Sequence, residues 1–242
     1  MSDRQRVAVV TGGSRGLGNV IARVLAVRGY DLVIGGRERS ALKDAAATLR
    51  GLGRRVVAVD GDISDPAVCT WLVDEARQLG GLQVLVNNAS ELGGVKPLAD
   101  TDAPLAEHIL RVNVVSPIVL VKLATPLLQQ DGGLIVNVSS DAARGAYPGW
   151  GVYGASKAAL ELLTTTMDAE LRSGRVFAVA VDPGDMRTRM QQEAFPGEDI
   201  SDRPEPEVTA PFWNWLFAQD PAAVGGQRFT AQEDLERWLL PA

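Results

Sequence analysis

The sequence predicts an α/β fold of the doubly wound type, in which helices cover both faces of a mostly parallel sheet. Short runs rich in Val, Leu and Ile alternate with longer stretches that carry apolar residues at helical spacing. Such alternation is the mark of repeated strand–helix–strand units. The length of 242 residues and the hydrophobic content of 46% favour one large domain, residues 1–242, over two small ones.

The strands are expected where the apolar runs are almost continuous, because a strand buried on both faces has no polar side. A seventh, weaker run completes the expected sheet. The predicted strands are residues 6–10, 31–34, 55–59, 83–86, 134–138, 176–181 and 227–229.

Five helices are expected between these strands, with apolar residues three and four positions apart. They cover residues 17–28, 40–52, 66–79, 104–129 and 153–172. Ser40 and Asp65 are expected to cap the second and third helices, and Pro66 suits a first helical position. Pro117 and Pro126 predict a bend or an early end in the fourth helix.

Residues 190–211 are rich in Gln, Glu, Asp, Pro and Ser and show little apolar periodicity. This composition predicts a mobile loop. Long irregular insertions in compact domains are often lids over binding sites, and a plain solvent-exposed connection is the alternative.

Composition excludes several classes of protein. The net charge of −6 and the absence of a basic block argue against nucleic acid as a partner. We expect no membrane span, because no stretch approaches about 20 uncharged residues. The polar N-terminus argues against a secretory signal, so a cytoplasmic protein is expected. Cys69 and His108 are the only residues of their kinds, which excludes an internal disulfide and argues against a metal site or a Ser/His/Asp hydrolase.

A glycine-rich segment, Thr11 to Gly18, follows the first expected strand and opens the first expected helix. Glycines allow a tight turn and let a pyrophosphate approach backbone N–H groups at the positive end of the helix. The segment therefore predicts binding of a dinucleotide.

The charges around this segment favour NADP(H) over NAD(H). Proteins that bind the unphosphorylated cofactor place a carboxylate near the end of the second strand, where this chain has Gly36. Arg15 and Arg37 instead supply two guanidinium groups that suit a 2′-phosphate. Glu38 is the nearest acid and is expected to point to solvent.

Tyr153 and Lys157 stand four residues apart in an expected helix, which places a phenol and an ammonium on one face. A neighbouring positive charge favours ionisation of a phenol and would lower its pKa toward neutrality. The pair therefore suits proton exchange with a substrate, although an ordinary solvated pair has the same spacing.

Five motifs together resemble the short-chain dehydrogenase/reductase family, in an NADP(H)-preferring, bacterial-type form. They occur in the family's order between residues 6 and about 190. They are Thr11-Gly12-x-x-x-Gly16-x-Gly18, Asn87-Asn88-Ala89-Ser90, Asn113, Ser140 with Tyr153-x-x-x-Lys157, and Pro183-Gly184 with Thr188.

The resemblance implies a Rossmann fold of seven mostly parallel strands and a catalytic group made of Asn113, Ser140, Tyr153 and Lys157. In that group Ser140 donates a hydrogen bond to a substrate oxygen, Tyr153 supplies a proton, and Asn113 positions a water that relays protons to Lys157. The neighbouring Ser139 competes with Ser140, and the family's spacing favours Ser140. The implied cofactor-binding residues are Gly12, Ser14, Arg15, Gly16, Leu17, Gly18, Arg37, Asp62, Ile63, Asn88, Ala89, Tyr153, Lys157, Pro183, Gly184 and Thr188. Asn88 has the alternative role of holding strand ends together, and Thr188 that of capping a short helix.

Two departures from the family pattern concern the site and the C-terminus. Ser90 stands where the family usually has glycine, and residues 225–229 lack the usual Asp-Gly-Gly ending. The tail at 233–240 is typical of a short amphipathic helix, which packs on its own subunit or reaches a partner. Trp213 and Trp215 are expected to fill a core or a subunit interface.

Substrate-facing residues are expected from a loop at 186–211 and from Ala143, Tyr147 and Trp150, where packing on neighbouring helices is the alternative role. Residues 158–166 contain small side chains that permit close helix approach. By resemblance, a homodimer or homotetramer is expected.

The sequence thus predicts an NADP(H)-dependent carbonyl reductase that converts a ketone or aldehyde to an alcohol, or the reverse. The expected partner is a small carbonyl or alcohol substrate, and no metal is expected. A non-catalytic NADP-binding regulatory or scaffold protein with the same fold is the alternative. A sugar-nucleotide epimerase or dehydratase shares Tyr-x-x-x-Lys but needs an added substrate domain, for which this chain is too short.

Overall fold

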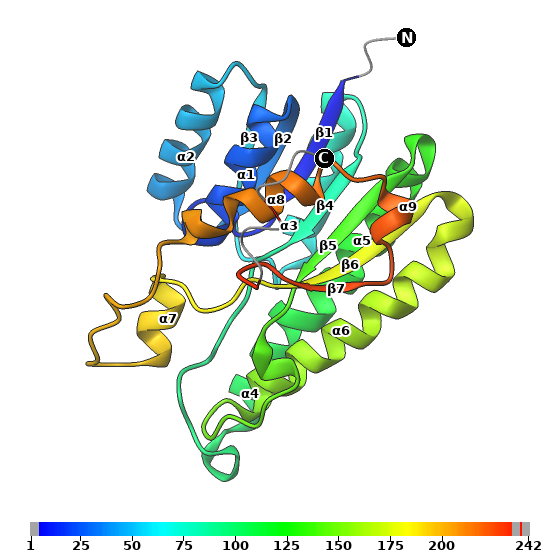
Figure 1. The fold of residues 1–242 in the computed structure, drawn as a ribbon. Coiled ribbons are helices and arrows are strands. Elements are labelled where there is room, and N and C mark those ends of the chain that lie inside the picture. The colour runs from blue at the N-terminus through cyan, green and yellow to red at the C-terminus, as the bar shows by residue number, and fades with distance from the viewer. Residues whose placement is uncertain (1–4, 234–237, 239–242) are drawn as a thin grey trace.

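A parallel sheet of seven strands forms the centre of the computed structural model, which describes residues 5–233 and Trp238 (Figure 1). The strand order is β3-β2-β1-β4-β5-β6-β7, and each neighbouring pair is parallel. The strands are β1 (Arg6–Val10), β2 (Tyr30–Gly36), β3 (Val56–Asp60), β4 (Val84–Asn87), β5 (Gly133–Val138), β6 (Val176–Asp182) and β7 (Arg228–Thr230). The expected doubly wound Rossmann sheet is confirmed.

Helices cover both faces of this sheet, because alternate side chains of a strand point to opposite sides. In β1, Ala8 and Val10 belong to one apolar cluster, while Val7 and Val9 belong to the other. The first cluster is completed by α1 (Gly16–Val27), α2 (Arg39–Gly51) and α8 (Ala210–Leu216), and the second by α3 (Pro66–Leu79), α5 (Ser116–Asp131) and α6 (Gly151–Leu171). Two separate cores therefore hold the sheet between them (Figure 1).

One predicted helix cap is confirmed and the other is wrong. The Asp65 side chain accepts a hydrogen bond from the backbone N–H of Ala67 at the start of α3. Ser40 does not cap α2, because that helix begins one residue earlier, at Arg39, and Glu38 occupies the cap position without a side-chain bond. Serine is a residue type that often caps helices, but the predicted start of this helix lay one residue too late.

The helix expected at 104–129 is one helical run with a change of pitch. It consists of α4 (Ala103–Leu110), a π-helical turn (Arg111–Val115) and α5. Pro117 lies in the first turn of α5, where its missing N–H costs little. Pro126 lies inside α5 without ending it. Its ring is on the exposed side of the helix, where water can bond to the freed carbonyl group.

The same run is the one candidate membrane span found within the described residues. Ala103–Asp131 is long and apolar enough by length and composition, with a mean hydropathy of 1.5, although half of that window is buried inside the protein. Core helices of globular domains pass the same test. The expectation that no stretch is long and apolar enough to span a membrane was therefore too strict. The apolar residues of α5 are explained by its packing against α3.

Residues 190–211 are more ordered than a loop. They contain most of α7 (Arg189–Ala194), a 3-10 turn (Pro206–Thr209) and the start of α8, and a further short helix follows, α9 (Pro221–Val224). The irregular part is confined to the stretch between α7 and the 3-10 turn. The expectation of one long loop was wrong because six-residue helices are too short to show apolar periodicity.

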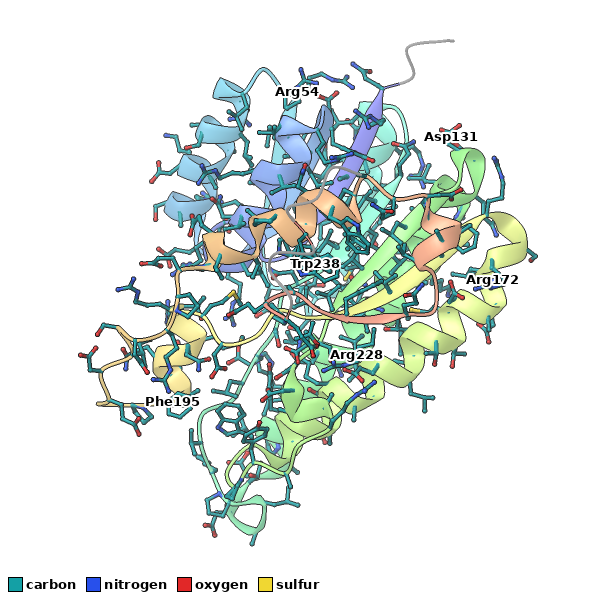
Figure 2. All side chains as sticks on the ribbon, viewed as in Figure 1. Arg54, Asp131, Arg172, Phe195, Arg228 and Trp238 are labelled. Atoms are coloured by element: carbon teal, nitrogen blue, oxygen red, sulfur yellow. The ribbon has the colours of Figure 1, made fainter. Side chains whose placement is uncertain are left out.

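An aromatic cluster covers one face of the sheet near the end of the chain (Figure 2). Trp213 is fully buried in the core, as expected. The Trp238 ring lies 5.0 Å from Phe212 and 4.6 Å from Trp215, measured between ring centroids. The tail helix expected at 233–240 lies mostly outside the described residues, but Trp238 itself packs on its own chain.

Candidate active site

A large cavity, about 1010 Å³ in volume, lies at the carboxyl ends of β1, β2, β4, β5 and β6. This is where ligands bind in open α/β sheets. The cavity is lined by almost all of the residues expected to bind a cofactor: Gly12, Ser14, Arg15, Gly16, Leu17, Gly18, Arg37, Asp62, Ile63, Asn88, Ala89, Tyr153, Lys157, Pro183 and Thr188. Gly184, Asn113 and Ser140 are not among its lining residues.

The glycine-rich loop enters α1 through a close backbone contact. A Cβ atom on Gly18 would lie 2.2 Å from the carbonyl oxygen of Gly12 and 2.5 Å from Nδ2 of Asn88. Real Cβ atoms do not approach backbone so closely, so only glycine fits here. The loop thereby turns its backbone toward the cavity at the N-terminus of α1, which is the geometry that a pyrophosphate group requires.

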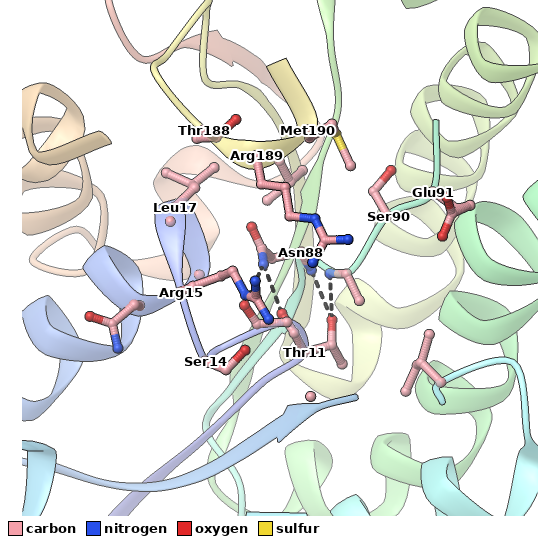
Figure 3. A pocket seen from close by; sticks show the side chains of 18 of the residues that line it. Thr11, Ser14, Arg15, Leu17, Asn88, Ser90, Glu91, Thr188, Arg189 and Met190 are labelled. Carbon is pink, nitrogen blue, oxygen red and sulfur yellow. Dashed lines mark hydrogen bonds between the residues drawn. The ribbon is translucent and has the colours of Figure 1, made fainter. Parts of the chain in front are cut away.

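Hydrogen bonds fasten this loop to the end of β4 (Figure 3). The Thr11 hydroxyl oxygen accepts from the backbone N–H groups of Asn88, at 2.9 Å, and Ala89, at 3.0 Å. In return, Nδ2 of Asn88 donates to the carbonyl oxygens of Thr11 and Gly12. Asn88 therefore holds strand ends together and also lines the cavity, so the two roles weighed for it are compatible.

Both guanidinium groups expected near a 2′-phosphate are present, and each is paired with a carboxylate. Arg15 forms an ion pair with Glu38. Arg37 lies 3.2 Å from Oε2 of Glu91 and 3.8 Å from Oδ2 of Asp62. Glu38 is exposed to solvent, as expected, but it also pairs with Arg15, which was not expected. A phosphate group would have to replace these carboxylates as the partner of Arg15 and Arg37.

Asp62 and Ile63 line the cavity next to the same arginines. Burial acts to raise the pKa of the Asp62 carboxyl group, but hydrogen bonds from Ser64 and the charge of Arg37 together lower it. Asp62 also accepts a hydrogen bond from the backbone N–H of Ser64 at 2.8 Å. This turn after β3 is therefore held in one conformation at the edge of the cavity.

Tyr153 and Lys157 lie in the first two turns of α6, and both side chains are buried, with 7% and 2% exposure. The Lys157 ammonium group donates a hydrogen bond to the carbonyl oxygen of Val138 at 2.7 Å and lies 5.6 Å from the centre of the Tyr153 ring. Burial lowers the pKa of Lys157 to about 8, while Asp182 opposes that change. Helical spacing thus does bring the pair to one wall of the cavity.

Lys157 does not lower the pKa of Tyr153 as expected. Burial raises the pKa of Tyr153 to about 12, and hydrogen bonds from Ser140 and Ser90 only partly offset it. The reason is that a phenol with 7% exposure loses the water that would stabilise its ionised form. Tyr153 is consequently protonated at neutral pH, which suits a group that gives a proton away.

The two adjacent serines have different partners. The Ser139 hydroxyl, on a buried residue, donates to Oε1 of Glu161 at 2.7 Å. Ser140 is one of the two serines that lower the pKa of Tyr153, and its hydroxyl donates to Oδ1 of Asp141 at 3.0 Å. This influence on Tyr153 favours Ser140 over Ser139 as the serine that acts with the phenol, although Ser139 is the one that lines the large cavity.

Asn113 lies in the π-helical turn, almost fully buried. Its Nδ2 donates to the carbonyl oxygen of Glu91 and to the Ser156 hydroxyl, both at 2.9 Å. Its Oδ1 accepts from the Ser90 hydroxyl at 3.1 Å and from the backbone N–H of Glu91 at 2.8 Å. The side chain thus joins the loop after β4 to α6.

Two aromatic residues before Tyr153, Tyr147 and Trp150, form a chain of ring contacts that ends at Tyr153. The Trp150 ring meets Tyr153 edge-on with centroids 6.0 Å apart, and it contacts Phe195 in the same manner at 6.0 Å. Tyr147 lies 5.3 Å from Trp150 and is 43% exposed. Ala143, Tyr147 and Trp150 line a second, more open hollow of about 520 Å³. Both the wall role and the packing role expected for Trp150 are compatible with this position.

Pro183 and residues 186–190 line the cavity, and Thr188 lies beside the glycine-rich loop, because a Cβ atom on Gly16 would be 3.6 Å from Cγ2 of Thr188 (Figure 3). The Thr188 hydroxyl caps α7 by accepting from the backbone N–H of Gln191, and Thr188 also lines the cavity. Gly184 has a positive φ of 75°, and its N–H donates to Oδ1 of Asp182. It shapes the turn after β6 without lining the cavity.

The rim of the cavity is lined by Met186, Arg187, Arg189, Met190 and Glu193 together with residues 205–207. All of them lie within the segment 186–211, from which substrate-facing residues were expected. Sequence reasoning missed Glu91, which lines the cavity and pairs with Arg37 but follows no family motif. Within the described residues, no cluster of three or more His, Cys, Asp or Glu side chains could hold a metal ion.

Comparisons with known proteins agree with this geometry. Residues 6–199 match the short chain dehydrogenase family. The uncharacterised oxidoreductase YciK of Escherichia coli K12 is 30% identical over 237 residues, covering 94% of this chain and 92% of that protein.

Two solved structures with bound cofactor are also similar to this chain. A short chain dehydrogenase of Shigella flexneri 2a, complexed with NADP, has a TM-score of 0.87 and 28% identity and covers 96% of this chain and 100% of that chain. A 7α-hydroxysteroid dehydrogenase complexed with NADH and 7-oxo glycochenodeoxycholic acid has a TM-score of 0.84 and 27% identity, covering 94% and 93%. Their cofactors differ, so they support nicotinamide binding in general.

Proposed function

The chain belongs to the short-chain dehydrogenase family of oxidoreductases, and on that premise we propose that it interconverts a carbonyl compound and its alcohol with NADP(H). In the reducing direction the substrate is a ketone or an aldehyde of small to medium size. The related structure with bound 7-oxo glycochenodeoxycholic acid supports a carbonyl or alcohol substrate. Neither the family nor its matched relatives favour a non-catalytic regulatory or scaffold role.

The observation that carries the proposal is the buried Tyr153 hydroxyl at the wall of a cavity built around a phosphate-binding loop. Ser140 lies within reach of that hydroxyl, and Lys157 lies one helical turn away. A protonated phenol beside a second hydroxyl can give a proton to a developing alkoxide and hydrogen-bond to it at the same time. Both groups are held on α6 and the end of β5, which are rigid parts of the fold.

The residues of the cavity fit a nicotinamide dinucleotide. The backbone of residues 12–18 would hold the pyrophosphate, and Asp62, Ile63 and Ala89 would surround the adenosine. Bound there, the cofactor supplies a hydride for the carbonyl carbon. Lys157 would bind the ribose next to the nicotinamide, and Pro183 and Thr188 would line the ring's pocket.

The proton path uses this chain's own groups. Tyr153 gives its phenolic proton to the substrate oxygen as that oxygen gains negative charge. Ser140 turns its hydroxyl from Asp141 toward the same oxygen, which it can do because the Asp141 carboxylate is also bonded by the Tyr147 hydroxyl. We propose that Asn113 acts by fixing the loop after β4 against α6, since its side-chain atoms are occupied by protein partners.

The preference for NADP(H) is proposed from Arg15 and Arg37. Replacing Arg37 with Ala should raise the dissociation constant of NADPH about tenfold, since a charge-assisted bond to a 2′-phosphate is lost. The dissociation constant of NADH should change little. Isothermal titration of both cofactors measures this, with Arg77→Ala on the exposed side of α3 as control. NADH binding as tightly as NADPH to the unaltered protein would contradict the preference.

The function itself is tested with a panel of ketones, quinones, aldehydes and keto-esters. Consumption of NADPH is followed at 340 nm for each compound, with the purified chain at neutral pH. We expect turnover of at least one apolar carbonyl compound, because Leu92, Trp150, Met190 and Phe195 surround Tyr153 with apolar surface. A panel on which the protein shows no turnover while binding NADPH would favour the non-catalytic alternative.

We further propose that the chain is one cytoplasmic domain that assembles as a homodimer or homotetramer, with residues 186–211, which include α7, as its substrate-binding segment. Four apolar side chains on the helical run 103–131 and on α6 are exposed and suit an interface: Leu110, Val115, Ile118 and Leu162. Light scattering should give a mass at least twice 25.7 kDa. A monomer at micromolar concentration would contradict the assembly.

A further inference from the structure

Ser90 is the residue of the cavity that the family pattern does not explain. It follows Asn87, Asn88 and Ala89 at the end of β4, where the family usually has glycine, and it lines the cavity together with Tyr153 and Lys157. Glycine is not needed there for the backbone, because Arg175 is the only non-glycine residue with a positive φ in the described part of the chain. Position 90 can therefore carry a side chain without strain, and Figure 3 shows the Ser90 side chain at the cavity.

The Ser90 hydroxyl lies between two groups of the site. It donates a hydrogen bond to Oδ1 of Asn113 at 3.1 Å. Ser90 and Tyr153 line the same cavity, and Ser90 is, with Ser140, one of the two side chains whose hydroxyls lower the pKa of Tyr153. Asn113 in turn donates to Ser156, and Ser156 donates to the carbonyl oxygen of Tyr153 at 2.6 Å. Ser90 is thus connected to the backbone of Tyr153 through Asn113 and Ser156, and it faces the same cavity as the phenol.

We propose that Ser90 is a further catalytic residue, whose hydroxyl donates a hydrogen bond to the Tyr153 oxygen when that oxygen becomes negatively charged. The proposal rests on the proposed function, in which Tyr153 gives its proton to the substrate. In that step the Ser140 hydroxyl turns toward the substrate oxygen, so its interaction with the phenol oxygen weakens. Ser90, in the loop after β4, is then the hydroxyl that remains to donate to the phenol oxygen.

The change of partner leaves no buried group unpaired. While Tyr153 is protonated, Ser90 donates to Asn113 and can accept from the phenol. After the phenolic proton has moved to the substrate oxygen, the Ser90 O–H rotates to the phenolate. Oδ1 of Asn113 still accepts from the backbone N–H of Glu91 at 2.8 Å. Because that acceptor keeps a partner, the rotation avoids the usual cost of a buried unsatisfied group.

The electrostatics of Tyr153 show why a second donor is useful. Burial raises the pKa of Tyr153, and the carboxylates of Asp141 and Asp182 raise it further. The hydrogen bond with Ser90 acts in the opposite direction. The Lys157 ammonium group lies 5.6 Å from the centre of the Tyr153 ring, and Ser140 and Ser90 are the two side chains whose hydroxyls lower the pKa of the phenol. Because Ser140 turns to the substrate, the Ser90 hydroxyl has a large share in stabilising a phenolate.

Three variants test the proposal. Ser90→Ala removes the hydroxyl, Ser90→Thr retains it, and Ser173→Ala removes an exposed hydroxyl in the turn after α6. The first readout is the rate of alcohol oxidation from pH 6 to 11, with NADP⁺ and the alcohol of whichever panel compound the protein reduces. Oxidation needs Tyr153 as a base, so its rate rises as the phenol ionises.

We expect Ser90→Ala to lower kcat for oxidation about tenfold at neutral pH, since one hydrogen bond to a charged group is lost. The apparent pKa of the profile should move upward, while Ser90→Thr restores it and Ser173→Ala leaves it in place. A rise in KM and in the cofactor dissociation constant, with an unchanged pH profile, would show that Ser90 only holds the loop and would overturn the proposal.

The second readout does not depend on turnover. The chain has three tyrosines, so labelling their Cζ atoms with ¹³C gives three NMR signals, and Tyr153→Phe assigns the one of interest. Ser90→Ala should move the Tyr153 signal and leave those of Tyr30 and Tyr147 in place, and Ser90→Thr should bring it back. An unmoved Tyr153 signal in Ser90→Ala rejects the contact even if the protein is an active reductase. Should the panel show no turnover, this measurement still decides the contact.

Discussion

Replacing Tyr153 with Phe is expected to lower kcat for carbonyl reduction by about a thousandfold, within the range that a positioned general acid contributes. The phenol ring is 7% exposed and packs edge-on against Trp150, and Phe keeps that packing. Only the hydroxyl, with its bonds to Ser140 and Ser90, is lost. Steady-state rates with the best compound of the panel measure the loss, and NADPH affinity measured alongside should stay within about twofold.

Tyr30→Phe is the matched control, because Tyr30 is also buried but lies at the start of β2, away from the cavity. Its kcat should equal that of the unaltered protein. Near-normal turnover in Tyr153→Phe would remove the proton donor from the mechanism. Proton transfer would then have to come from Ser140 or from water, and the role proposed for Ser90 would lose its basis.

Replacing Gly18 with Ala should damage the phosphate-binding loop. The new Cβ would lie 2.2 Å from the carbonyl oxygen of Gly12, and backbone cannot give way as a side chain can. We expect the free energy of unfolding to fall by about 2 kcal/mol, a usual cost of overpacking. The dissociation constant of NADPH should rise at least tenfold because the loop's N–H groups are displaced from the pyrophosphate. Urea unfolding and isothermal titration measure the two effects.

Gly51→Ala is the matched control for this substitution. Gly51 ends α2, and its Cβ would meet nothing within 4 Å. Alanine there should stabilise the protein slightly, by up to about 1 kcal/mol, and leave NADPH binding unchanged. If Gly18→Ala binds NADPH as the unaltered protein does, the cofactor does not lie against this loop.

The sheet could be predicted from the sequence because its strands are buried on both faces. Runs such as 6–10 and 176–181 consist mostly of Val and Ala, because burial from two sides favours apolar residues at every position. Helix ends were less certain, as Ser40 shows, because capping depends on the backbone angles of one residue. The π-helical turn and the tolerated Pro126 depend on tertiary packing, which leaves no mark in local sequence.

The candidate site could be predicted where chemistry requires particular residues at fixed spacing. The loop at 11–18, Asn88 and the Tyr153–Lys157 pair all lie at one cavity, as their motifs indicated. The ion pairs of Arg15 with Glu38 and Arg37 with Glu91 could not be predicted, because they join segments that only folding brings together. The raised pKa of Tyr153 was missed for a related reason, since burial outweighs the effect of a nearby cation.

The reciprocal bonds between Thr11 and Asn88 limit how this protein can be recombined with its relatives. Thr11 belongs to the N-terminal half of the sheet, and Asn88 belongs to the half that begins with β4. The Thr11 hydroxyl accepts from backbone N–H groups at Asn88 and Ala89, and the Asn88 side chain donates to the backbone carbonyl of Thr11. A chimera that exchanges residues 6–79 for those of another reductase must therefore inherit a compatible partner for Asn88. Exchanging that half can change the cofactor specificity only if the hydrogen bonds between Thr11 and residues 88–89 are preserved in the chimera.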